Sequence, residues 1–140
     1  MLAGTARAPR GMATDELLRF FGLERVAGER VRNLPHGFQK ILEIAMTLAG
    51  APDMVLLDEP FCGLTAGDIE RVSERLRSLR AGGVTFMVVE HNMRALMQIV
   101  DRVYVLNFGR QIGDGSPAEI AQNPEVITAY LGSARHAARG

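Results

Sequence analysis

The apolar residues of this chain follow two patterns, one with the period of a helix and one without interruption. Helical spacing predicts helices in four segments, Thr14–Leu23, Phe38–Ala49, Thr65–Arg80 and Met93–Val100. Thr14 would cap the first helix, and Thr65 with Asp68 has the pattern of a capping box at the start of the third. Runs of consecutive apolar residues predict strands at Met54–Leu57 and Thr85–Glu90. Because Met54–Leu57 has no alternating polar residue, we expect both faces of this strand to be covered.

The order of these segments indicates the fold class. Strand, helix, strand and helix follow one another from Met54 to Val100, an order that predicts parallel strands joined by helical crossovers and therefore an α/β fold. A hairpin between Val103–Asn107 and Gln111–Ile112 is expected next. Ser116-Pro117 and Asn123-Pro124 then have the pattern of two capped helix starts.

Composition and charge narrow the possible functions. The 140 residues are 47% apolar and 23% charged, the balance of a globular domain and not of a disordered chain. The 16 basic and 16 acidic side chains cancel, so we expect no nucleic-acid partner. A single cysteine, Cys62, indicates a reducing compartment such as the cytoplasm. The single lysine, Lys40, does not belong to a P-loop pattern.

Two carboxylates and a histidine follow the two predicted parallel strands. Asp58 and Glu59 come directly after Met54–Leu57, and His91 follows the strand that ends at Glu90. Ligands bind at the carboxyl ends of parallel strands, where Asp58 would suit Mg²⁺ and Glu59 would act on a water that attacks a phosphoryl group. His91 would contact a terminal phosphate. The alternative is that the acids only cap loop amides and that His91 is a structural group.

Besides the carboxylates and the histidine, a third candidate for a functional site lies at the start of the predicted helix Phe38–Ala49. It is the segment Leu34–Lys40. Free backbone N–H groups and the helix dipole make a helix start an anion site. Gly37 permits the close backbone approach that a phosphate needs. An ordinary junction between a loop and a helix would explain the same residues.

Three glycines nearer the carboxyl end suggest a further possibility. The spacing of Gly109, Gly113 and Gly115 is similar to a dinucleotide-binding fingerprint. No helix of suitable length follows them, so hairpin turns explain them better.

Taken together, four segments in this order resemble the second half of an ATP-binding cassette ATPase. They would be the signature motif, the Walker B strand, the D-loop and the switch-histidine loop, at Leu34–Lys40, Met54–Pro60, Phe61–Thr65 and Val89–His91. The ending, from Asn123 to Gly132, resembles the subgroup that serves importers of branched-chain amino acids and of urea or amides. The resemblance implies a P-loop NTPase-like (RecA-like) α/β fold: a parallel sheet flanked by helices, incomplete, with a remnant of the helical subdomain.

The resemblance implies a role for each residue of the candidate site. Asp58 would bind Mg²⁺ through water. Glu59 would polarise the attacking water and His91 would contact the γ-phosphate, so these two would be the catalytic residues. ATP and Mg²⁺ are the cofactors that follow from this resemblance.

A second set of residues would face the nucleotide held by a second ATPase subunit. It consists of signature residues and two D-loop residues, namely Pro35, His36, Gly37, Gln39, Gly63 and Leu64. Pro35 and His36 depart from the family's pattern, which usually has serine and glycine at these positions. The lost hydroxyl would weaken the contact with phosphate.

The resemblance also implies that this is a truncated cassette. The family's P-loop, Q-loop and adenine-stacking aromatic have no counterpart here, so the chain would not bind ATP unaided. Its parts would be a loose arm (1–13), a helical-subdomain remnant with the signature motif (14–50), the C-terminal part of the ATPase core (51–132) and a loose tail (133–140).

The expected function is that of the energy-coupling ATPase subunit of an importer. Its partners would be a second ATPase subunit and membrane-spanning permease subunits, and it would lie at the cytoplasmic face of the membrane. Self-association is expected through the sheet edge that the missing P-loop strand would leave bare. The alternative is a non-catalytic interaction module that completes another cassette in trans.

Overall fold

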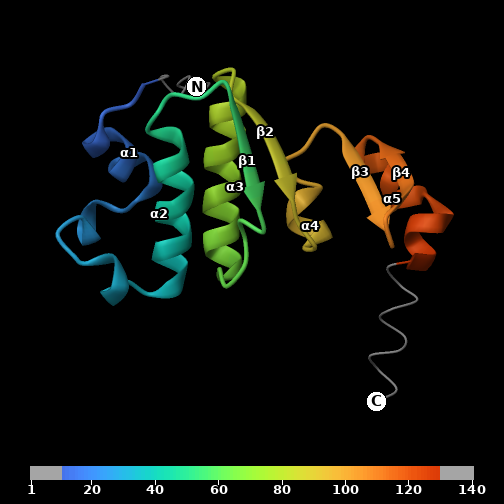
Figure 1. Ribbon diagram of the computed structural model, residues 1–140, viewed down its shortest axis with the longest axis horizontal. Coiled ribbons are helices and arrows are strands. Elements are labelled where there is room, and N and C mark those ends of the chain that lie inside the picture. Colours follow the sequence, from blue (N-terminus) through green and yellow to red (C-terminus); the bar gives the residue numbers. More distant parts are fainter. Residues whose placement is uncertain (1–10, 130–140) are drawn as a thin grey trace, which may run out of the picture. The chain divides into compact units, whose positions relative to one another are not determined.

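The computed structural model describes residues 11–129 (Figure 1). The described residues form two compact units, which divide between Ile99 and Val100. Most of the predicted loose arm and all of the predicted tail lie outside the described residues. The division predicted near residue 50 remains a prediction. No helix among residues 11–129 is both long and apolar enough to cross a bilayer.

The first unit begins with two α-helices separated by two short 3-10 helices. The elements are α1 (Thr14–Phe21), η1 (Glu24–Val26), η2 (Val31–Asn33) and α2 (His36–Leu48). α1 packs against α2, and its apolar face buries Leu17 and Phe21. Both predicted helices are therefore confirmed, although the N-cap of α1 and the first residue of α2 differ from the prediction.

The two helix starts differ from the prediction because of local hydrogen bonds. The N-cap of α1 is Ala13 and not Thr14, and the backbone N–H of Ala13 donates to the carboxylate of Glu16 at 3.0 Å. α2 begins two residues before Phe38, because Pro35 is extended and its carbonyl oxygen accepts the N–H of Phe38 at 2.9 Å. The signature-like residues therefore form the first turn of α2.

The parallel arrangement that the sequence predicts is confirmed. β1 (Met54–Asp58) pairs in parallel with β2 (Thr85–Val89), and α3 (Ala66–Ala81) connects them. Asp58 lies opposite Val89, so both strands end at the same edge (Figure 1). α4 (Met93–Leu96) is shorter than predicted, because the turn after it tightens and Ile99 donates its N–H to the carbonyl of Leu96, three residues back.

Only one face of this small sheet is covered. Val55 and Leu57 are buried, whereas Leu56 is 69% exposed. Met54, Met87 and Val89 are also exposed apolar residues on these strands. Successive side chains of a strand point to opposite faces, and α2 contacts β1, but no described element covers the second face. The prediction that both faces of the first strand are covered is therefore wrong for residues 11–129.

α3 contains a buried hydroxyl that leads to a testable prediction. Ser73 is 0% exposed, and its Oγ has no hydrogen-bond partner among the described residues. A buried polar group without a partner costs about 1–3 kcal/mol. Ser73→Ala is expected to raise the free energy of unfolding by about 1 kcal/mol, measured by chemical denaturation. The half-buried Ser78 of the same helix is the matched control. An equal gain from Ser78→Ala would attribute the effect to helix propensity alone.

The second unit is a hairpin followed by a helix. β3 (Val103–Asn107) and β4 (Arg110–Gly115) pair antiparallel, and α5 (Pro117–Gln122) contacts β4. The side chain of Ser116 caps α5 as predicted, and residues 124–129 are also helical. The hairpin is confirmed, with a second strand longer than predicted.

The glycines of the hairpin serve two purposes. Gly109 lies in the turn with a φ of +77°, as a turn glycine is expected to do. Gly113 lies inside β4, where an added Cβ would be 2.9 Å from the Cδ1 of Ile120 and 3.0 Å from a methyl of Val126. Hairpin turns therefore explain Gly109, whereas close packing explains Gly113.

Candidate functional site

The polypeptide turns sharply where β1 ends. The backbone N–H of Glu59 donates to the carbonyl of Val89 at 2.8 Å, which extends the pairing of the two strands by one bond. Glu59 has a φ of +45°, in the left-handed region that residues other than glycine rarely adopt. Such strained positions concentrate at functional sites. The turn leaves the Glu59 side chain 52% exposed.

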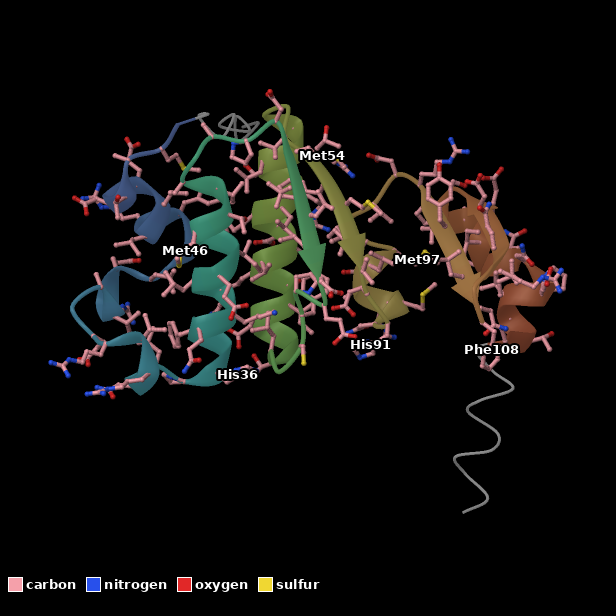
Figure 2. All side chains as sticks on the ribbon, in the orientation of Figure 1. His36, Met46, Met54, His91, Met97 and Phe108 are labelled. Atoms are coloured by element: carbon pink, nitrogen blue, oxygen red, sulfur yellow. The ribbon has the colours of Figure 1, made fainter. Side chains whose placement is uncertain are left out.

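The histidine that follows β2 lies beside this carboxylate. The Nδ1 atom of His91 is 3.4 Å from Oε1 of Glu59, and its side chain is 71% exposed. Figure 2 shows His91 at the end of the unit to which β1 and β2 point. The structure thus brings Glu59 and His91 together across the parallel strands. Asp58, the last residue of β1, is exposed and lies opposite Val89 in the register.

Glu90 is a third acidic residue at this edge, and its place in the sequence does not predict a role for it. Its side chain is only 1% exposed. Its Oε1 accepts the backbone N–H of Phe61 at 3.1 Å, and its Oε2 accepts those of His91 and Asn92, each at 2.8 Å. Because Phe61 and Glu90 are 29 positions apart, this contact depends on the strand pairing. The pattern of the sequence contains no signal for it.

The signature-like residues pack against the loop that follows β1. An added Cβ on Gly63 would lie 2.5 Å from Cδ2 of the His36 ring, and Gly63 has a φ of +72°. An added Cβ on Gly37 would lie 3.5 Å from a methyl of Leu64. Two predicted groups, His36 with Gly37 and Gly63 with Leu64, are therefore in contact within one chain. Figure 2 shows His36 at the same end of the unit as His91.

The first turn of α2 retains free donors. The backbone N–H groups of His36 and Gly37 have no hydrogen-bond partner in the described part of the chain. Such donors at the positive end of a helix dipole favour an anion. Pro35 is the exposed N-cap. Gln39 points elsewhere, because its Nε2 donates to the carbonyl of Leu34 at 2.8 Å and stabilises the loop.

The start of α3 lies beside the first turn of α2. Thr65 and Asp68 form the predicted capping box: the Thr65 hydroxyl donates to the Asp68 carboxylate at 2.6 Å and accepts the N–H of Asp68 at 3.2 Å. The hydrogen bond from Thr65, helped by Arg71, holds the pKa of Asp68 below its ordinary value. Asp68 is therefore a charged cap beside Gly37.

The donor set fits magnesium better than a metal held by protein ligands alone. Among residues 11–129, no group of three or more His, Cys, Asp or Glu side chains could hold a metal ion. Mg²⁺ typically uses one or two carboxylates and fills its other positions with water and substrate phosphates. The exposed carboxylate of Asp58, next to Glu59, fits that arrangement.

Comparison with known proteins supports the same family. A family model described as "Branched-chain amino acid ATP-binding cassette transporter" matches residues 110–136. The chain is 39% identical over 118 residues to the high-affinity branched-chain amino acid transport ATP-binding protein LivG of Escherichia coli (strain K12), with 84% of this chain and 46% of LivG covered. It is 37% identical over 113 residues to BraF of Pseudomonas aeruginosa, with 80% of this chain and 44% of BraF covered.

Solved structures give the same result at the level of the fold. The crystal structure of an ATP-binding cassette of an ABC transporter in its ADP conformation matches with a TM-score of 0.74 at 28% identity, over 83% of this chain and 47% of that chain. The chain therefore spans about half the length of the relatives that it matches. The parallel strands and these similarities together show that the chain belongs to the ATP-binding cassette ATPases, in the branched-chain amino acid transporter family.

Proposed function

We propose that this chain is the C-terminal part of the ATP-binding subunit of an importer for branched-chain amino acids or for urea or amides, and that branched-chain amino acids are the better supported of these solutes. The observation that carries the proposal is the pairing of Glu59 with His91 at 3.4 Å, at the end of two parallel strands. The similarity to LivG and BraF supports the solute class. ATP bound with Mg²⁺ is the proposed substrate.

Each residue at the strand ends has a defined task in this proposal. Asp58 holds Mg²⁺ through water; when bound, the ion neutralises charge on the phosphate oxygens. Glu59 accepts a proton from the water that attacks the γ-phosphate. His91 contacts a γ-phosphate oxygen, and the carboxylate of Glu59 lies beside its imidazole.

The start of α2 and the loop after β1 would serve the nucleotide of a second ATPase subunit. The free N–H groups of His36 and Gly37 bind its phosphates, and Pro35 shapes the approach as the N-cap. Gln39 supports this turn through its bond to Leu34. Gly63 and Leu64, which lie against this helix start, would face the partner subunit.

The remaining partners follow from the same assignment. The complete subunit works with membrane-spanning permease subunits at the cytoplasmic face of the membrane. In this proposal ATP is held by a P-loop outside these 140 residues, because they contain no P-loop pattern. We also propose self-association through the bare edge of the β1–β2 sheet, and exposed apolar residues of these strands, such as Leu56 and Met87, support it.

A chimera tests the proposal. The 118-residue segment of Escherichia coli LivG that this chain matches is replaced by the corresponding segment of this chain. We expect the chimera to hydrolyse ATP and, expressed with the other transporter proteins, to restore leucine uptake in a strain without LivG. Unaltered LivG is the positive control.

Two outcomes would decide against the proposal. A folded chimera with neither hydrolysis nor uptake would contradict it. Stimulation of a full-length relative's ATPase by the separate chain, with no activity in the chimera, would instead favour the non-catalytic interaction module that completes another cassette in trans.

A further inference from the structure

The carboxylate of Glu90 joins two loops that come from different strands. The first, named here the interface loop, is Phe61–Leu64 after β1. The second, named here the histidine loop, is His91–Asn92 after β2. One oxygen of Glu90 accepts an N–H from the interface loop, and the other accepts two from the histidine loop.

The burial of this carboxylate makes the link strong. The side chain of Glu90 is 1% exposed, so its carboxylate oxygens depend on the three backbone donors in place of water. A hydrogen bond to a charged group is about twice as strong as one between neutral groups. The backbone N–H groups of Phe61, His91 and Asn92 are therefore all bound to one carboxylate.

The interface loop is in turn held by the start of α2. Gly63 lies against the ring of His36, and Leu64 lies against Gly37. At the other end of the link, the Nδ1 of His91 is 3.4 Å from Glu59 and 3.7 Å from Glu90. A continuous chain of contacts thus runs from the first turn of α2 to the imidazole.

We propose that Glu90 is a positioning residue that couples the interface loop to the histidine loop, so that movement of the first shifts the imidazole of His91 relative to Glu59. This rests on the proposed function, in which the interface loop faces a second subunit. A nucleotide clamped at that interface would then be sensed at the imidazole.

Glu90→Gln tests the link, because glutamine has one acceptor oxygen where glutamate has two. The variant can accept the hydrogen bond from the backbone N–H of Phe61, or those from His91 and Asn92, but it cannot accept all three. Amide hydrogen exchange of the chain, followed by NMR, is expected to become about 10-fold to 100-fold faster at one of the two loops. The exposed Glu70 of α3 provides the matched control, and Glu70→Gln should leave all three amides unchanged.

A second measurement shows whether Glu90 transmits a change from the interface loop to the histidine loop or only holds each loop in place. Leu64→Ala disturbs the interface loop at a distance from His91, and the ring resonances of His91 are compared in two backgrounds. We expect Leu64→Ala to shift these resonances when residue 90 is glutamate, and to leave them unchanged in Glu90→Gln. An equal shift in both backgrounds would overturn the coupling.

Unchanged protection of all three amides in a folded Glu90→Gln protein would also overturn the proposal. If Glu90→Gln does not fold, Glu90→Asp replaces it, because aspartate keeps the charge but is one methylene shorter. Full protection of both loops in folded Glu90→Asp would then be the contrary result. These measurements need no nucleotide, so an inactive chimera would contradict the proposed function without affecting the link.

Discussion

Glu59→Gln in the LivG chimera is expected to lower the rate of ATP hydrolysis by about 10²–10⁴-fold, the range for loss of a general base. Glutamine has nearly the same shape as glutamate, but it cannot accept the proton of the attacking water. ATP affinity should stay the same, since the proposed phosphate contacts belong to other residues. Steady-state hydrolysis and nucleotide titration, measured side by side, distinguish the two effects.

The control for this prediction is Glu70→Gln, the same chemical change on the exposed side of α3. It should hydrolyse ATP at the rate of the unsubstituted chimera. Hydrolysis by Glu59→Gln at a rate close to that of the control would show that another group activates the water. Glu59→Gly tests whether the backbone strain at this position matters, because glycine adopts the φ of +45° without strain. This variant should not hydrolyse ATP, and its free energy of unfolding should be no lower than that of the unsubstituted chimera.

Gly113→Val is expected to unfold the second unit. The added side chain would collide with Ile120 and Val126, whose methyl groups lie 2.9 and 3.0 Å from the position of a Cβ. Overpacking of this kind costs about 1–3 kcal/mol and occasionally more, which is a large share of the stability of so small a unit. NMR should show the loss of dispersed resonances from Val105 and Ile120, while those of the first unit persist.

Gly67→Ala is the matched control for this substitution. Gly67 lies in the first turn of α3, with no atom within 4 Å of an added Cβ and no positive φ. Alanine should therefore keep or raise the stability of the first unit. A Gly113→Val protein that melts at the temperature of the unsubstituted chain would show that the side chains of the second unit can move aside.

Most of the element order could be predicted from the sequence, because short-range signals specify it. The capping box of Thr65 and Asp68 and the Ser116 cap act within three residues, and both are confirmed. The cap of α1 was misplaced by one residue, since Ala13 offers only its backbone to Glu16. Such a cap has no side-chain signal in the sequence.

The closeness of Glu59 and His91 was also predictable, because parallel strands end at a common edge. Their identity as an acid and an imidazole comes from the sequence, and the register of β1 with β2 brings them to 3.4 Å. The packing of His36 on Gly63 could not be predicted in this way. It depends on where α2 lies relative to the loop, which local pattern does not specify.

The sequence by itself determined which residues form helices and strands, and which chemical groups stand at their ends, because neighbours along the chain set caps, turns and periodicity. Tertiary structure alone decided that one face of the β1–β2 sheet is exposed and that Glu90 holds two loops together. Burial and long-range hydrogen bonds depend on groups brought near in space, and Phe61 and Glu90 become neighbours only when the two strands pair.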